Sequence, residues 1–480
     1  MILLVGAILA ASLVVAMGAA RTGLPVLIGF LALGMVLGSD GPGGIEFDDA
    51  ELAREVGIVG LALILYEGGL QTSFRRLRQV AVPAALLSTV GVAVSAVLIG
   101  AAAHVLFDLS WLEAVLLGAV VSSTDAAAVF ATLRFTHIRR RVARTLEAES
   151  GGNDPMAIAL TIGLIAWIES PEDNGFAELV LLVVRELGLG LVVGVALGVL
   201  ATQVFGRLPA SIGAFAPVAS VAAAALSFGV ADVIGGSGFL AVYLVGLAVG
   251  STPSRYRRQL VSFHEGLAFL AQVALFVVLG LLVFPSDLPD VALASVALAL
   301  LLAFVARPVS VWVSTALTDF TNRERLLIGW AGLRGAIPIV LATFVLSSDV
   351  GERDTIFNAV FFVVVVSTIL QGTTLEWLAK RLGLVSPAPP AREAPLEVGA
   401  LSQLDLVDFV VAPDHAVNGS AVRELGLPRS ALVAVINRGD DTIPPRGSTV
   451  VKDGDHLFVL VPRSMRADLE DVFSRWRRRV

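Results

Sequence analysis

The chain has 480 residues, of which 56% are hydrophobic and only 16% are charged, and its mean hydropathy is +0.84. Soluble proteins average about 45–50% apolar and about 25% charged residues, so this composition excludes a water-soluble protein and indicates a polytopic membrane protein. The net charge of −7 offers no footprint for nucleic acid. The sequence contains no cysteine, which excludes disulfides, thiolate metal sites and cysteine nucleophiles.

Apolar stretches recur from the start of the chain to about residue 383. A helix that crosses the hydrocarbon core needs about 17–25 residues, and thirteen segments approach or exceed that length. We predict transmembrane helices at residues 2–20, 24–38, 52–70, 79–107, 111–133, 142–168, 176–205, 212–230, 236–250, 262–284, 288–317, 326–348 and 354–381. The first segment lacks a basic region before it, so we expect a retained helix rather than a signal peptide.

The connections between these segments alternate in charge. Odd-numbered connections are basic and even-numbered ones are acidic. The basic ones carry Arg21, Arg75, Arg139, Arg207, Arg257 and Arg323, and the acidic ones carry Asp40, Asp108, Glu169, Asp232, Asp287 and Asp349. Basic loops remain in the cytoplasm, so the pattern predicts an external amino terminus and a cytoplasmic carboxyl terminus.

The composition changes after the last apolar segment. Residues 384–396 contain a proline-rich run that is incompatible with a helix and typical of a stiff linker. Beyond it, short β-type runs at 407–412, 432–437 and 456–461 are separated by turn residues. We therefore expect a transmembrane domain at 1–383, the linker, and a small α/β domain at 397–480.

Charged residues within the spans are candidate functional residues, because a charge at a membrane helix centre costs about 2.5–3.5 kcal/mol. Glu67 follows an apolar run in the third span, where a carboxylate reaching the cytoplasmic surface is the alternative interpretation. In the fifth span, two serines precede Thr124 and Asp125. Hydroxyl groups can bond back to helix carbonyls, but that does not account for Asp125.

The sixth span contains the most polar segment between apolar flanks. Helical spacing places Ser150 and Asp154 on one face, and Glu149 and Asn153 on the adjoining face. A carboxylate beside a hydroxyl suits a partly dehydrated alkali cation or a proton, since hard cations take oxygen ligands. The second face requires a cationic partner.

The twelfth span supplies that partner. Arg334 stands between two glycines and precedes a proline, so its helix is predicted to be interrupted. We favour a structural ion pair between Arg334 and Glu149 over contact with a substrate. The fifth and twelfth spans are seven apart, as in two inverted copies of six helices joined by a seventh. Broken helices in corresponding places indicate a midplane ion site and alternating access.

Several of these motifs together resemble a known family. Thr124-Asp125, residues 149–155 and residues 332–335 resemble the cation/proton antiporters of the CPA1 branch, the NhaP and NHE-like exchangers. Residues 235–239 and 262–266 are similar to the NhaP2 (CvrA) potassium/proton antiporter subgroup. The tail resembles a TrkA-C (RCK-C) regulatory domain. The resemblance covers nearly the whole chain and implies a helical fold of about thirteen spans in two inverted repeats with interrupted helices.

The resemblance also implies roles for individual residues. Asp154 is the carboxylate that binds either a monovalent cation or protons. The remaining roles are ligand positions at Ser150, Glu67 and Thr124, a shaping role for Asp125, a structural ion pair of Glu149 with Arg334, and Asn153 where electrogenic members carry a second Asp. Members with Asn-Asp are expected to be electroneutral. Subgroup members also use Asp at the position of Glu67.

The implied function is exchange of cytoplasmic potassium for external protons, with no cofactor and no enzymatic activity. Sodium remains an alternative, since the ligand types do not discriminate ions of equal charge. A channel gated by the tail would need a TVGYG-like filter, and a membrane enzyme would need a cluster such as HExxH; neither occurs in the sequence.

The setting follows from the same resemblance. We expect a multi-pass protein of the bacterial inner membrane that forms a homodimer and contributes to pH and volume homeostasis. A nucleotide regulator of the tail, such as cyclic di-AMP, stays open. Basic clusters such as residues 139–141 are interpreted as determinants of topology and lipid contact rather than binding sites.

Overall fold

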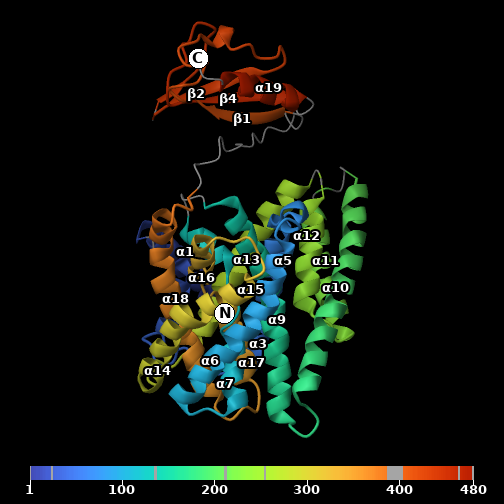
Figure 1. The fold of residues 1–480 in the computed structure, drawn as a ribbon, viewed down its shortest axis with the longest axis vertical. Coiled ribbons are helices and arrows are strands. Elements are labelled where there is room, and N and C mark those ends of the chain that lie inside the picture. Colours follow the sequence, from blue (N-terminus) through green and yellow to red (C-terminus); the bar gives the residue numbers. More distant parts are fainter. Residues whose placement is uncertain are drawn as a thin grey trace. The chain divides into compact units, whose positions relative to one another are not determined.

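The computed structural model forms two compact units, residues 1–385 and 386–480, which are described separately (Figure 1). The structure describes residues 2–22, 25–133, 138–209, 213, 215–252, 254, 256–385, 404–439, 441–462 and 465–477. Most of the expected linker at 384–396 lies outside these ranges.

The first unit is built from helices. Its first half comprises α1 (Ile2–Thr22), α2 (Val26–Leu37), α3 (Ala50–Gln71), α4 (Phe74–Leu77), α5 (Ala81–Leu86), a π-helical segment (Leu87–Gly91), α6 (Val92–Phe107), α7 (Trp111–Val120), α8 (Ala126–Thr132) and α9 (Arg140–Glu169). Its second half comprises α10 (Phe176–Arg207), α11 (Ala216–Val233), α12 (Gly238–Ser251), α13 (Arg257–Leu281), α14 (Leu288–Leu301), a π-helical segment (Leu302–Ala306), α15 (Arg307–Ser314), α16 (Asn322–Trp330), α17 (Ala336–Leu346) and α18 (Arg353–Arg381).

Each of the thirteen predicted spans contains helix. Within the described ranges, six helical stretches are long and apolar enough to cross a membrane, and shorter apolar helices include α2, α7, α12 and α17. The predicted interruptions are confirmed. The fifth span divides into α7 and α8, and the twelfth divides into α16 and α17.

Among the described residues, hydrogen bonds join connections whose charge has the same sign, and the two groups are here called the acidic end and the basic end of the unit. At the acidic end, Asp40 accepts hydrogen bonds from Ser286, and the Asp349 amide donates to Glu169. At the basic end, the Arg139 amide donates to the Leu384 carbonyl, and the Phe74 amide donates to Ser251. The α6–α7 and α9–α10 connections lie at the lower end of the helical unit in Figure 1.

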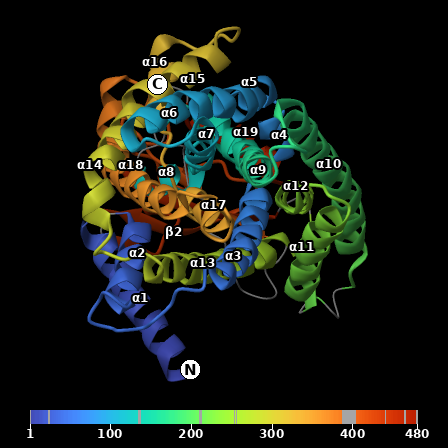
Figure 2. The same ribbon diagram turned by 90° about the horizontal axis from the view of Figure 1, so that it is seen from below.

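The polar α9 lies within the unit. Figure 2 shows α10 and α11 at one edge and α14 at the opposite edge, with α7, α9 and α17 between them. On α9, Glu149, Asn153 and Asp154 are at most 2% exposed. By contrast, α10 leaves many apolar side chains exposed, such as Val184 at 63%, as a lipid-facing helix does.

The second unit has four antiparallel strands in the order β1-β4-β2-β3. They are β1 (Leu404–Val410), β2 (Leu432–Arg438), β3 (Asp441–Ile443) and β4 (Asp455–Pro462), and the helix α19 (Arg466–Trp476) follows. The three predicted β-type runs fall on β1, β2 and β4. The core joins Phe409 of β1 to Phe473 and Trp476 of α19, with ring centroids 4.9 and 5.0 Å apart. This arrangement confirms a small α/β domain.

Candidate functional site

The two helix interruptions lie against each other. The Asp125 amide donates to the Leu333 carbonyl at 2.9 Å. Arg334 Nη1 donates to the carbonyl oxygens of Ser122 and Ser123 at 2.7 and 2.5 Å. Carbonyls that follow a helix end lack intrahelical partners, and the buried guanidinium supplies the missing donors. The segments 121–125 and 331–335, here called the crossing, therefore form one structure.

Opposite charges stand at opposite helix ends within the crossing. Both α8 and α17 begin there, and a helix amino terminus carries partial positive charge. Asp125 caps α8 by accepting the Ala128 amide at 3.1 Å. It also lies against the start of α17, since a Cβ on Gly335 would lie only 1.9 Å from Asp125 Oδ2. Arg334 binds the carbonyls that follow α7, where the partial charge is negative.

Three residues of α9 contact the interrupted fifth span. Asp154 Oδ1 accepts a hydrogen bond from Ser123 Oγ at 2.6 Å. Asn153 Nδ2 donates to Thr124 Oγ1 at 2.6 Å. Ser150, one turn before Asp154, accepts the first amide of α8 at 3.4 Å. The two faces that helical spacing predicts on α9 thus both bind the interrupted fifth span.

The structure gives Glu149 a different ion-pair partner from the one that the sequence predicts. Arg307 Nη1 lies 2.6 Å from Glu149 Oε1, and the two side chains are 3% and 1% exposed. Arg334 is instead engaged by the two carbonyls of the crossing. Sequence reasoning missed Arg307, although it lies well inside the eleventh span and satisfies the same criterion of a charge inside an apolar segment.

Four of the predicted site residues line one cavity. It has a volume of about 320 Å³, its walls include α3, α8, α9 and α17, and Glu67, Asp125, Ser150 and Asp154 face it. The residues that line it do not include Thr124, whose hydroxyl holds Asn153. The polar groups expected to handle a cation are therefore brought together, except for that hydroxyl.

Glu67 lies on α3, and side chains of α3 and α13 fix its position. Its carboxylate accepts a hydrogen bond from Gln71, which also donates to Glu265 of α13 at 3.3 Å. One residue earlier, Tyr66 bonds to Ser220 at 2.8 Å. That serine also contacts His264 Nε2 at 3.0 Å. The motif at 262–266 thus fixes the part of α3 that carries Glu67.

The cavity reaches toward the basic end of the unit, where Arg76 and Glu147 line it. A second cavity of about 460 Å³ lies at the acidic end, where Asp48, Asp287 and Asp354 line it. Both cavities border α3 and α17. Between them these helices pack closely, because a Cβ on Gly57 would lie 2.9 Å from Val340 Cγ1.

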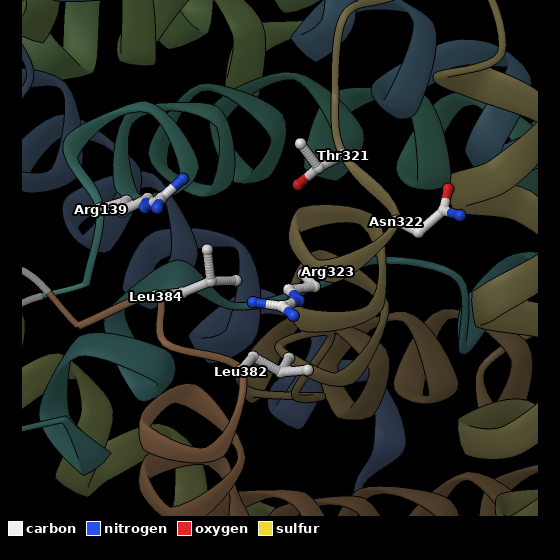
Figure 3. A pocket seen from close by; sticks show the side chains of 6 residues that line it. All are labelled: Arg139, Thr321, Asn322, Arg323, Leu382 and Leu384. Carbon is white, nitrogen blue, oxygen red and sulfur yellow. The ribbon is translucent and has the colours of Figure 1, made fainter.

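A third pocket, of about 420 Å³, lies at the basic end (Figure 3). It is lined by Arg139, Thr321, Asn322, Arg323, Leu382 and Leu384. Among the residues that the structure describes, its lining contains no carboxylate and none of the predicted site residues. Arg139 also lies 3.8 Å from Glu324, the residue that completes the amino-terminal cap of α16. We assign no cation site to this pocket.

These features define a class of membrane transporter with two crossing interrupted helices beside a buried carboxylate. The chain matches the family described as "Sodium/hydrogen exchanger, transmembrane" over residues 8–381 and the TrkA-C domain over residues 406–474. It belongs to the sodium/hydrogen exchanger family and carries a TrkA-C domain. The family that the sequence motifs predict is confirmed.

Individual relatives show which members of the family this chain resembles. The chain is 37% identical over 477 residues to the K(+)/H(+) antiporter NhaP2 of Shewanella baltica, covering 98% of this chain and 82% of the relative. It is 37% identical over 478 residues to the K(+)/H(+) antiporter NhaP of Alkalimonas amylolytica, covering 98% and 83%. The Na(+)/H(+) antiporter NhaS2 of Synechocystis is 28% identical over 361 residues, covering 72% and 64%.

A solved structure shares the fold. The sodium proton antiporter MjNhaP1 of Methanocaldococcus jannaschii, at pH 8, superimposes with a TM-score of 0.71. The match covers 79% of this chain and 98% of that chain, at 24% sequence identity. The predicted helical antiporter fold is thereby confirmed.

Proposed function

We propose that this protein exchanges a monovalent cation for a proton at Asp154. The observation that carries the proposal is the environment of this carboxylate. Asp154 is 2% exposed, lines the cavity and accepts a hydrogen bond from Ser123. Among the described residues it has no salt-bridge partner. A buried charge without a partner is strongly disfavoured, so the carboxylate holds either a proton or a cation, and this exclusion couples the two fluxes.

The proposed cation site uses oxygen atoms from several helices. Ser150 lies one helical turn from Asp154, and Glu67 faces the same cavity from α3. Thr124 and Asp125 belong to the crossing, where Asp125 also lines the cavity. Carboxylate, hydroxyl and carbonyl oxygens suit a hard alkali cation. Asn153, Glu149 and Arg334 complete the buried polar core that supports these residues.

Potassium is the proposed cation. The curated relatives at 37% identity that align with nearly all of this chain are named potassium/proton antiporters. Sodium is the second candidate, supported by the family description and by the sodium/proton antiporter NhaS2. The site chemistry alone does not separate them, because both ions carry one charge and take oxygen ligands.

The transport cycle is proposed to alternate access between the two cavities. The cavity that contains Asp154 reaches the basic end, which the positive-inside rule assigns to the cytoplasm. Asp154 lines this cavity and not the one at the acidic end, and α3 and α17 pack closely at Gly57 and Val340. We propose that this arrangement is an inward-open state of a protein in the bacterial inner membrane, with the amino terminus outside and the carboxyl terminus in the cytoplasm.

The exchange is proposed to be electroneutral. One carboxylate, Asp154, carries either one proton or one monovalent cation, while the neighbouring Asn153 amide donates to Thr124 and carries no charge. A second carboxylate at position 153 would add another charged group to the site. The charges carried in the two directions of one cycle would then no longer be equal. Asn153→Asp is therefore expected either to fail or to make exchange respond to membrane potential.

The two units have different proposed roles. Residues 1–383 carry out exchange, residues 384–396 link the units, and residues 397–480 regulate exchange from the cytoplasm, as the TrkA-C match at 406–474 supports. A nucleotide such as cyclic di-AMP is the proposed type of regulator. A homodimer is also proposed, since twofold assemblies are the commonest oligomers.

The test is proton flux in vesicles that contain the purified full chain. Potassium, sodium, lithium and rubidium are supplied in turn, with and without an imposed membrane potential. We expect the largest proton flux with potassium, and a rate that does not change with the potential. Proton flux that no cation drives would contradict the proposed exchange, and a larger sodium response would replace potassium by sodium.

A further inference from the structure

Ser123 contacts the carboxylate of Asp154 directly. Its hydroxyl donates to Asp154 Oδ1 at 2.6 Å, and its side chain is buried with only 1% of the residue exposed. When Asp154 is ionised, such a hydroxyl–carboxylate hydrogen bond is charge-assisted and about twice as strong as a neutral one. Ser123 is absent from the set of residues that sequence motifs nominate for the site.

The backbone of Ser123 is fixed on both sides. Its carbonyl oxygen accepts a hydrogen bond from Arg334 Nη1 at 2.5 Å, and the same nitrogen binds the Ser122 carbonyl. Two residues later, the Asp125 amide bonds to the Leu333 carbonyl. The segment is not helical, so these contacts, rather than a helical ladder, determine where the Ser123 hydroxyl points.

Arg334 is itself held in place. Its amide donates to Ser367 Oγ at 3.3 Å, and its carbonyl accepts from Thr368 Oγ1 at 3.1 Å. Both residues belong to α18. A chain of contacts therefore runs from α18 through Arg334 and the Ser123 backbone to one oxygen of Asp154.

The neighbouring Ser122 has a different role. It is equally buried, and its carbonyl also binds Arg334. Its hydroxyl, however, donates to the Ala119 carbonyl at 2.6 Å, within the last turn of α7. The two adjacent serines thus share a backbone environment and differ in whether the side chain reaches Asp154.

Asp154 lines the cavity, whereas Ser123 does not. The hydroxyl thus binds one carboxylate oxygen, Oδ1, of a residue that also lines the cavity, and Oδ2 is not used in this bond. A ligand that is already oriented loses less conformational freedom when a cation binds, which increases affinity.

We propose that Ser123 is a positioning residue for exchange: it orients the Asp154 carboxylate toward the cavity, and Arg334 acts through it. This inference rests on the proposed exchange at Asp154 and identifies what sets the apparent cation affinity of that site. Ser123 acts from the crossing rather than from the cavity wall.

The test compares Ser123→Ala, Ser123→Thr and Ser122→Ala as full-length proteins in vesicles. Proton flux is measured against potassium concentration to obtain KM and the maximal rate. For Ser123→Ala we expect KM to rise about tenfold or more, since removing a hydrogen bond to a charged group costs about 1.5–3 kcal/mol, while the maximal rate per folded protein changes by less than about twofold. Ser123→Thr retains the hydroxyl and restores a KM close to wild type.

Ser122→Ala separates positioning from packing. It removes an equally buried hydroxyl that does not reach Asp154, so it is expected to lower the yield of folded protein without raising KM. If Ser123→Ala does not fold, Ser123→Cys provides a weak donor of similar shape in a chain that has no other cysteine, and its KM is expected to lie above that of Ser123→Thr.

An unchanged KM in Ser123→Ala, or in Ser123→Cys when that variant is the one that folds, would overturn the inference. Equal changes of KM in Ser123→Ala and Ser122→Ala would do the same, because they would reduce the role of Ser123 to packing. Failure of the proposed function looks different: the wild-type protein would then show no cation-driven proton flux, and no KM would exist to compare.

Discussion

The two interrupted helices of this exchanger use opposite chemistry at the same point of the fold. The break between α7 and α8 is acidic and rich in hydroxyls: Ser123 and Thr124 bond to α9, and Asp125 caps α8. The break between α16 and α17 consists of small and apolar residues around the single charge of Arg334. One break contacts the carboxylate of Asp154, and the other holds the first break in place.

This chemical difference indicates that the two segments of the crossing have separate roles. A break leaves backbone groups without partners, which inside a membrane must be satisfied within the protein. Arg334 satisfies carbonyls of the first break, and Asp125 caps α8 beside the start of α17. Substitutions that remove the hydroxyl of Ser123 or Thr124, which bond to α9, should therefore alter cation handling, whereas substitutions around the second break should mainly alter stability.

The largest effect is expected at Asp154. Asp154→Asn removes the group that alternates between proton and cation, so cation-driven proton flux should fall to background while the protein still folds, since asparagine has nearly the same shape. Flux in vesicles measures the loss, and thermal unfolding of the purified variant measures the fold. Persistent cation-dependent proton flux in this variant would remove Asp154 from the mechanism.

Substitution of Arg307 is expected to have the next largest effect, which is a loss of protein stability. Arg307→Ala leaves Glu149 buried without its partner at 2.6 Å, and breaking a buried pair costs about 3–5 kcal/mol. Adding Glu149→Gln removes the stranded charge and should restore much of the loss. The midpoints of thermal unfolding of the single and double variants in detergent measure this recovery. If the double variant is no more stable than Arg307→Ala, Arg307 stabilises the protein by something other than its ion pair with Glu149.

The second unit contains its own ion pair, between Arg438 and Asp455. It tests whether an ion pair outside the helical unit also contributes to stability. Burial alone would raise the pKa of Asp455, but hydrogen bonds from Arg438 and the Lys452 amide hold that pKa below its usual value. Asp455→Asn should cost about 1.5–3 kcal/mol at neutral pH. Faster hydrogen exchange in β4 of the full-length protein would measure it.

The sign of the pH effect follows from the lowered pKa. The stabilisation from ionised Asp455 is fully present above its unfolded value, about 3.9, and is lost as pH falls through the lower folded value. The difference between wild type and Asp455→Asn should therefore shrink in strong acid. An equal difference at neutral and strongly acidic pH would mean that the charge of Asp455 does not contribute.

Gly335→Ala probes how closely the two breaks must approach. The added Cβ would meet Asp125 Oδ2 at 1.9 Å and Asp125 Cβ at 2.6 Å, so one break must shift. Overpacking of this kind costs about 1–3 kcal/mol, and we expect a lower unfolding midpoint together with slower exchange. Gly206→Ala, where a Cβ meets nothing within 4 Å, is the matched control. Identical behaviour of the two variants would contradict a tight crossing.

The smallest effect is expected for Thr124→Ser. The serine hydroxyl still accepts the hydrogen bond that Asn153 donates at 2.6 Å, so the potassium KM should change by less than about twofold, within the range of conservative changes. Thr124→Val keeps the shape but removes the acceptor and should be clearly worse. Flux titrations distinguish them, and equal KM values for Ser and Val would show that this hydrogen bond is dispensable.

Several features of the site were predictable because they depend on chain-local signals. Helical spacing on α9 predicts that Asp154 and Ser150 share a face, and both line the cavity. The glycines around Arg334 predict an interrupted helix, which the structure contains. By contrast, the partner of Glu149 was predicted as Arg334 and is Arg307. Two buried arginines lie on different spans, and sequence spacing carries no information about which of them reaches a given carboxylate.

The sequence by itself determined the membrane class, the order of the spans, the grouping of acidic and basic connections and the position of both breaks. Each follows from local chemistry: hydrophobic length, loop charge, and glycine or polar residues inside an apolar run. Only the tertiary structure decided that Arg334 binds backbone carbonyls, that Arg307 neutralises Glu149 and that Ser123 reaches Asp154. These pairings join segments that are distant in the chain, and packing of the helices alone brings their atoms within bonding distance.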